Sequence, residues 1–397
     1  MARRQVMVGE LRFGMYVAEL DRPWTETPFM FQGFHLRSEQ QLAALRKFCR
    51  HVLIDVERSD TAALARPAAG AAPSSSPGFA IRGQARYPAQ TRLKKELDHA
   101  GALFARSTAV LQALFRPLAW GSTSPDGKPV DEAVTALAQS VVRNPDALLL
   151  MSRMRDNSVA AHARALQVSI LMMVFARFLQ LERDEIKLLG LLGLLQDIGK
   201  TRLPAVLLEK QGSLSAEESE MAKRHVEVSG HILGAMPGLP PKLAALALLH
   251  HERQDGGGYP RGLKAYQIGL YGSIAAICDT YDALTAVRPY AQQLSPSAAV
   301  VQLLKERGSA FHAGLVDLFV QCLGAFPVGS IVELNSGETG VVIAENAEQR
   351  LKPVVVVVPS GQVLDLAEEP RTAGGEPYRV RRTLEQSRVA FDPRELL

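Results

Sequence analysis

Histidine and aspartate residues recur in the middle of the chain, where apolar helical segments end or where one polar side chain interrupts an apolar run. Imidazole and carboxylate groups are the usual ligands of iron, manganese and zinc, and a carboxylate can bridge two ions about 3.5–4 Å apart. These residue types therefore suggest two neighbouring metal ions. The candidate ligands are His162, Asp197, His225, His250, His251 and Asp279.

Asp197 follows a long apolar run and is itself followed by Gly199 and Lys200. Glycine commonly ends helices because it adopts left-handed backbone angles without strain. We expect Gly199 to end this helix, so that the Asp197 carboxylate and the Lys200 ammonium group face a cavity. Lys200 is then a candidate for contact with a phosphate or with a leaving oxygen.

The pair His250 and His251 ends another apolar helical segment, Leu243 to Leu249. Neighbouring residues on a helix are about 100° apart, so both rings can reach one dinuclear centre. Asp279 lies inside the apolar segment from Ile274 to Leu284. A carboxylate in such surroundings needs a partner, and a metal ion is one candidate.

Taken singly, each residue also has a simpler interpretation. His162 and His225 fit hydrogen-bonded histidines of a core or a surface, and Asp279 fits an acid paired with an arginine. The run from Gly256 to Gly258 fits an ordinary turn, and it lacks the Gly-Lys-Ser/Thr ending of a phosphate loop. The order and combination of these residues favour the metal site.

The elements that position these residues follow from local patterns. Helical periodicity broken at glycine or proline predicts an all-α core, preceded by a connecting helix over residues 92–115 that either pairs across a homodimer or packs on the core. Short alternating runs predict a small α+β module at the N-terminus, and β-branched runs predict a small β-rich C-terminal region. The expected regions are 1–60 (α+β module), 61–88 (Ala/Pro/Ser-rich linker), 89–129 (connecting helical segment), 130–326 (helical domain) and 327–397 (β-rich region).

Composition limits the function classes. The chain has 397 residues, 47% of them hydrophobic and 22% charged, with a formal net charge of +4. That balance is too mild to indicate a nucleic-acid polymer as partner. Three cysteines without a Cys-X-X-Cys pair fit a reducing compartment, so we expect a cytoplasmic protein. No run approaches about 20 apolar residues, so we expect no membrane span.

Several segments together resemble the HD-GYP subgroup of the HD phosphohydrolases, from about residue 156 to residue 326. The residues before them, including Gly14–Val17 and Asp21–Trp24, resemble a module of unknown function that often precedes this domain. The segments that carry the resemblance are His162, Asp197–Lys200, His225, His250–Glu252, Asp255–Gly262, Asp279–Ala283 and Arg288–Tyr290.

The resemblance implies a metal-dependent phosphodiesterase of bacterial second-messenger signalling, with an HD-type helical core, that hydrolyses cyclic di-GMP to linear pGpG or GMP at two iron or manganese ions. The six candidate ligands would hold the metal, with Asp197 as the bridge. Lys200 would assist catalysis and bind substrate. Arg288 would clamp a phosphate, and Gly258, Tyr259 and Pro260 would shape the substrate side of the pocket.

Three positions depart from the family pattern. Ser158 stands where some relatives have a glutamate ligand, Ala291 stands where a basic residue is common, and Gln196 stands where the family has the histidine of its His-Asp pair. A neutral amide is a far weaker ligand than imidazole, so one of the two metal sites is expected to be weak. This substitution keeps a second hypothesis open, a catalytically weak or inactive receptor or scaffold that binds cyclic di-GMP, a diguanylate cyclase or other signalling proteins. A third is an HD phosphohydrolase for mononucleotides or other cyclic dinucleotides.

Overall fold

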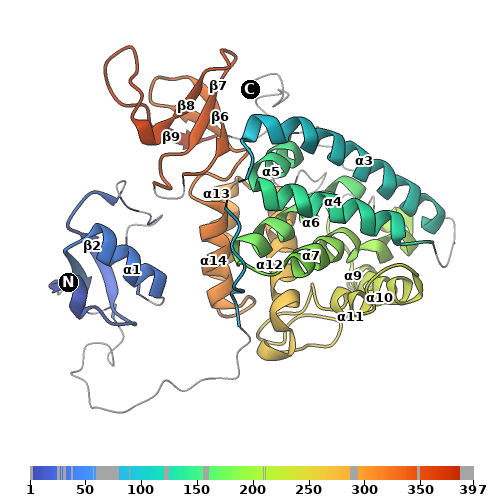
Figure 1. Cartoon of the computed structure of the whole chain (residues 1–397). Helices are drawn as coiled ribbons and strands as arrows, with labels where there is room; N and C mark the ends of the chain where they lie inside the picture. The colour runs from blue at the N-terminus through green and yellow to red at the C-terminus, as the bar shows by residue number, and fades with distance from the viewer. Residues whose placement is uncertain are drawn as a thin grey trace.

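A computed structural model gives the fold of the chain. It describes residues 3–24, 27, 29, 33–36, 39–56, 58–59, 80–88, 90–119, 125–154, 161–208, 210, 212–286, 294–346 and 349–384. In chain order, a small N-terminal sheet with one helix comes first, a helical core follows, and a small C-terminal sheet comes last (Figure 1). The predicted fold class is therefore confirmed. Residues 61–79 of the expected linker lie outside the described residues, and the predicted domain boundaries stay predictions.

The N-terminal module is a four-stranded antiparallel sheet with one helix. Its strand order is β1-β4-β2-β3. Phe29 and Phe34 stack with ring centroids 4.7 Å apart, and Trp24 meets both rings edge-on. These aromatic side chains pack with the buried residues of the module, so they form part of its core. The elements are β1 (Arg3–Met7), η1 (Val8–Glu10), β2 (Tyr16–Leu20), β3 (Phe34–His35), α1 (Glu39–Phe48) and β4 (His51–Asp55).

The helical core is built around α6 and α7, which pack on one another and on α3, α4, α5 and α12. Every residue of helix α7 from Leu188 to Leu195 is buried. The helices are α3 (Leu93–Ala119), α4 (Lys128–Arg143), α5 (Pro145–Met154), α6 (Ala161–Phe178), α7 (Arg183–Leu195), η3 (Ile198–Arg202), α8 (Ala205–Leu208), α9 (Ala216–Lys223), α10 (His225–Ala235), α11 (Lys242–Ala247), η4 (Ala265–Gln267), α12 (Gly269–Thr285), α13 (Pro296–Lys305) and α14 (Ala313–Leu323).

Helix α3 uses its apolar face within this chain. Leu97, Phe104 and Leu111 are buried in the same cluster as the residues of α6 and α7. Glu96 is also buried, and its carboxylate accepts two bonds from the Arg143 guanidinium, at 2.7 Å and 3.0 Å between the paired nitrogen and oxygen atoms. A buried carboxylate is stable only when it is paired in this way. The connecting helix therefore packs on the helical core.

The C-terminal region is a five-stranded antiparallel sheet with the order β8-β7-β6-β5-β9. Side chains alternate between the two faces of a strand. Val355 and Val357 lie in a small core of the sheet itself, whereas Val341, Ile343 and Val356 belong to the hydrophobic cluster of the helices. The elements are β5 (Ile331–Leu334), β6 (Thr339–Ala344), β7 (Val354–Val358), β8 (Val363–Asp365), η5 (Leu366–Glu368) and β9 (Val380–Thr383).

None of the helices in the described ranges combines the length and the apolar character that crossing a bilayer requires.

Candidate metal centre

Four of the predicted ligands converge at one point of the helical core. Asp197, His225, His250 and His251 each offer a donor atom, and these atoms all lie within 4.8 Å of one another. Asp197 comes from the turn after α7, His225 begins α10, and the two adjacent histidines follow α11. The convergence of three separate segments on one point is what a metal site requires.

The histidine rings are oriented as metal ligands usually are. The Nδ1 atom of His225 lies 2.6 Å from the carbonyl oxygen of Ala222, and Nδ1 of His250 lies 2.7 Å from that of Ala247. A carbonyl oxygen only accepts hydrogen bonds, so in each ring Nδ1 donates the proton. In the neutral rings the lone pair is therefore on Nε2, and a backbone acceptor fixes the tautomer in this way at many metal sites.

The freed lone pairs face a carboxylate. Oδ1 of Asp197 lies 3.1 Å from Nε2 of His225 and 3.5 Å from Nε2 of His250, and the two nitrogen atoms are 3.4 Å apart. Oδ1 is buried, and no hydrogen bond with satisfactory geometry reaches it within the described part of the chain. Three electron-rich atoms that face one another need a cation between them. The donor set therefore fits one divalent metal ion.

Lys200 holds the other oxygen of the same carboxylate, with 2.5 Å between its Nζ and Oδ2 of Asp197. Burial alone would raise the pKa of Asp197, but the charge of Lys200 and the two neighbouring histidines, His225 and His250, outweigh burial and hold that pKa well below its usual value. Burial, together with the charge of His250, lowers the pKa of His251. A deprotonated acid and a neutral imidazole are the forms that bind metal.

Gly199 allows this geometry by close packing. The α7 helix ends at Leu195, and Gly199 continues the chain inside the 3-10 turn η3, so the prediction that Gly199 ends the helix is wrong. A Cβ at Gly199 would lie 2.1 Å from the carbonyl oxygen of His225 and 2.6 Å from the backbone nitrogen of Ser229. The glycine is required because α10 lies directly against η3, which brings His225 to Asp197.

The predicted Gly-Tyr-Pro loop packs on the histidine pair. The ring of Tyr259 stacks on that of His251, with centroids 4.6 Å apart, and the peptide bond to Pro260 is cis. A Cβ at Gly258 would lie 2.4 Å from the backbone nitrogen of Arg253. The buried carboxylate of Glu252 accepts hydrogen bonds from the backbone N–H groups of residues 261 and 263, each at 2.8 Å. The loop is thus fixed beside the candidate metal ligands.

A cavity of about 140 Å³ lies beside Asp197 and is also lined by Lys200. Asp279 lines it but lies outside the four-residue cluster. The Gln196 amide also lines the cavity, and both of its polar atoms are buried without a hydrogen-bond partner among the described residues. Arg164 reaches the same cavity from α6, with both Nε and Nη2 at 3.1 Å from Oδ2 of Asp282.

Two predicted site residues cannot be placed here. His162 lies in the first turn of α6, but its side chain lies outside the described residues, and Arg288 lies outside them altogether. The sequence reasoning also assigned no role to Arg164 or Glu252. Glu252 directly follows the histidine pair, which is the only local signal that it serves this site. Arg164 gave no signal, because its partner Asp282 is 118 positions away in the chain.

Comparison with known proteins decides the family. A family described as an HD domain matches residues 149–314, and one described as a domain of unknown function (DUF3391) matches residues 3–124. A cyclic di-GMP phosphodiesterase of Pseudomonas aeruginosa is 33% identical over 387 residues, which covers 94% of this chain and 92% of that protein. The chain belongs to the HD-GYP family of cyclic di-GMP phosphodiesterases.

Other relatives match shorter stretches of the chain. A cyclic di-GMP phosphodiesterase response regulator of Xanthomonas campestris is 35% identical over 147 residues, which cover 37% of this chain and 39% of that protein. A 3'3'-cGAMP-specific phosphodiesterase of Vibrio cholerae is 35% identical over 128 residues, 32% of this chain and 24% of that protein. The family thus includes enzymes named for two different cyclic dinucleotides.

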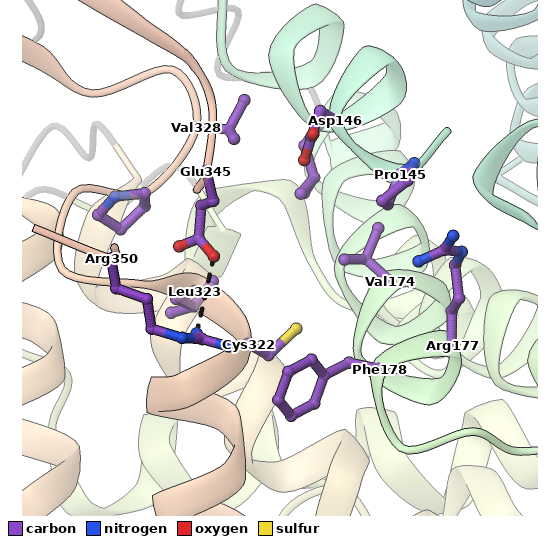
Figure 2. A pocket seen from close by; sticks show the side chains of 12 residues that line it. Pro145, Asp146, Val174, Arg177, Phe178, Cys322, Leu323, Val328, Glu345 and Arg350 are labelled. Carbon is purple, nitrogen blue, oxygen red and sulfur yellow. Dashed lines mark ion pairs between the residues drawn. The ribbon is translucent and has the colours of Figure 1, made fainter. Parts of the chain in front are cut away.

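A second cavity of about 250 Å³ lies apart from the metal centre of this HD-GYP protein, between the helical core and the C-terminal sheet (Figure 2). Glu345, just after β6, and Arg350 form an ion pair of 3.8 Å there. Burial, more than the neighbouring charge of Asp146, raises the pKa of Glu345 to about 8. Burial also raises the pKa of Asp146 to about 6. This junction therefore keeps weakly ionised acids in an apolar setting.

Proposed function

We propose that this protein hydrolyses cyclic di-GMP to linear pGpG or GMP, as a metal-dependent phosphodiesterase of bacterial second-messenger signalling. The observation that carries the proposal is the approach of Asp197 Oδ1 to the Nε2 atoms of His225 and His250, at 3.1 Å and 3.5 Å. The match to a cyclic di-GMP phosphodiesterase over 92% of its length supports the choice of substrate.

The ligand set that we propose for the first ion is Asp197, His225, His250 and His251, and iron or manganese suits its mixture of carboxylate and imidazole. A divalent ion held there supplies positive charge that activates water and stabilises the charge growing on the phosphate oxygens. Asp197 stays ionised because Lys200 and the histidines lower its pKa. The backbone carbonyls of Ala222 and Ala247 keep two of the rings in the ligand tautomer.

The other residues act on the substrate side in this proposal. Lys200, one third exposed, contacts a phosphate or a leaving oxygen while it remains beside Asp197. Gly258, Tyr259 and Pro260 form the wall over the histidine pair, and Tyr259 keeps His251 in place by stacking. We assign Arg288 to a phosphate clamp on the basis of the sequence motif alone.

A second ion beside Asp197 would depend on His162, Asp279 and Gln196. The donor set at this position is poorer than that of the first, because an amide oxygen replaces an imidazole and carries no formal charge. Asp279 is the one carboxylate of the three residues. We therefore expect the first ion to bind much more tightly than any second one.

The deciding experiment is anaerobic incubation of iron- or manganese-loaded protein with cyclic di-GMP, with chromatography of the products. The test variant is Asp197→Ala, and the matched control is Asp184→Ala, which removes an exposed acid from α7. We expect pGpG or GMP from the parent and the control only. Intact substrate with verified metal loading would instead support a receptor or scaffold. Preferential cleavage of 3'3'-cGAMP in the same assay would change the assigned substrate.

A further inference from the structure

The cavity beside Asp197 is lined by two side-chain cations, Lys200 and Arg164. Arg164 binds Oδ2 of Asp282 through Nε and Nη2, and its side chain is 28% exposed toward the cavity that Asp197 and Asp279 also line. Its remaining amino group, Nη1, has no hydrogen-bond partner among the residues that the structure describes. The Arg164 guanidinium thus lines the cavity beside Asp197 with one amino group that no described residue binds.

Charges at this side of the site are balanced without a second ion. Asp197 pairs with Lys200 at 2.5 Å, and Asp282 pairs with Arg164 at 3.1 Å. Asp279 interacts electrostatically with Arg164 as well as with the partly buried Arg253. Among the described residues, these interactions join three carboxylates, Asp197, Asp279 and Asp282, to three cations, Lys200, Arg164 and Arg253.

Gln196 fits an arginine better than it fits a metal ion. Its amide oxygen and nitrogen are buried and have no partner among the described residues, yet the side chain lines the same cavity as Arg164. An amide oxygen is a good acceptor for a guanidinium N–H but a weak ligand for iron or manganese. The residue that weakens the second metal position is thus suited to hold an arginine beside it.

From these contacts we propose that the Arg164 guanidinium takes the place of the second divalent ion, so that the site works with one ion and one arginine. The arginine donates from Nη1 toward the substrate phosphate and stabilises the charge that develops on its oxygens. Arginine suits this role because its planar group binds a carboxylate on one edge and a phosphate on another. This inference rests on the proposed function, and it makes Arg164 a substrate-binding residue of the same site.

The test is the number of metal ions bound by the full chain. Protein loaded anaerobically with Mn²⁺ alone and then freed of excess metal is analysed by elemental mass spectrometry and electron paramagnetic resonance. We expect one ion per chain and the spectrum of an isolated Mn²⁺ ion. Two tightly bound ions per chain with an exchange-coupled spectrum would overturn the proposal.

Variants distinguish the effect of Arg164 on the number of bound ions from the effect of Gln196. Gln196→His alone should still bind one ion, because Arg164 keeps its place, whereas Gln196→His combined with Arg164→Met should bind two. Arg164→Lys keeps a cation and should bind one. The matched control is Arg307→Met, which breaks a similar bidentate pair with Asp317 away from this cavity. If the double variant fails to fold, the ion count of the parent and of Gln196→His still decides.

Activity provides an independent readout. Arg164→Met should retain the first ion and lose about 100-fold in turnover of cyclic di-GMP, the size of effect seen when one preorganised donor to a developing oxyanion is removed. Hydrolysis by a parent chain with two bound ions would sink this inference and leave the proposed function intact. One bound ion per chain without hydrolysis would contradict the proposed function but agree with the ion count inferred here. A chain without tightly bound metal would contradict both proposals.

Discussion

Gly199 and His225 are in such close contact that a Cβ on Gly199 would lie 2.1 Å from the His225 carbonyl oxygen. Gly199→Ala should therefore push α10 away from η3 and separate His225 from Asp197. We expect a loss of about 1–3 kcal/mol in the free energy of unfolding and at least a tenfold weaker affinity for the first metal ion. Chemical denaturation and metal titration measure the two effects. Gly234→Ala on the same helix is the control, since its nearest neighbour would be 3.9 Å away, and equal effects of both changes would contradict this account.

His225 and His231 lie on the same helix, one buried against Asp197 and the other exposed. His225→Ala should abolish tight binding of the first ion and lower phosphodiesterase activity at least 100-fold, because one of four donors and its fixed tautomer are lost. His231→Ala should leave both unchanged. Metal content after desalting checks the first expectation, and full metal retention by His225→Ala would remove this residue from the ligand set.

Glu252 fixes the loop that follows the histidine pair, through two backbone hydrogen bonds of 2.8 Å. Glu252→Gln keeps the shape but places an amide NH₂ group against one of these N–H donors. Leaving a buried donor unsatisfied costs about 1–3 kcal/mol, and we expect a raised KM for cyclic di-GMP with little change in metal content. The control is Asp255→Asn, an exposed acid whose Oδ1 caps the neighbouring turn. An unaltered KM in Glu252→Gln would show that the loop does not depend on this carboxylate.

Glu345 should make the stability of the fold depend on pH. Its pKa is raised in the folded state from 4.5 to about 8 by burial, so the folded protein binds this proton more tightly than the unfolded chain does. Below pH 4.5 the ionisation of Glu345 does not affect the free energy of unfolding. As pH rises from about 4.5 to 8, it lowers that free energy increasingly. Asp146, with a pKa raised to about 6, acts in the same direction.

Glu345→Gln should remove this dependence and stabilise the protein by about 1–3 kcal/mol above pH 8, with little effect near pH 5. Thermal unfolding of parent and variant between pH 5 and pH 9 measures the difference. Glu333→Gln is the control, because this glutamate is ion-paired with Arg382 and its pKa is lowered. A difference between parent and Glu345→Gln that stays constant over the whole range would exclude the mechanism.

The sequence predicted the helical core and the residues of the candidate metal centre because both depend on local signals. Apolar periodicity located α7 and α12, and the motifs containing Asp197 and His250 carried the family resemblance. Contacts between residues far apart in the sequence could not be predicted in the same way. The pairing of Arg164 with Asp282 depends on α6 lying beside α12, and the role of Gly199 depends on how closely α10 approaches η3.

The boundary between the two matched families falls between residues 124 and 149, but the hydrophobic core extends across it. Leu97 and Phe104 of α3 belong to the first family's range, and Val341 and Val356 lie beyond the second, but all four are buried in the hydrophobic cluster that surrounds α7. A fragment limited to residues 149–314 would expose this cluster to water on two sides. The smallest autonomously folding phosphodiesterase is therefore expected to extend from the start of α3 through the C-terminal sheet, beyond the limits of the matched HD domain.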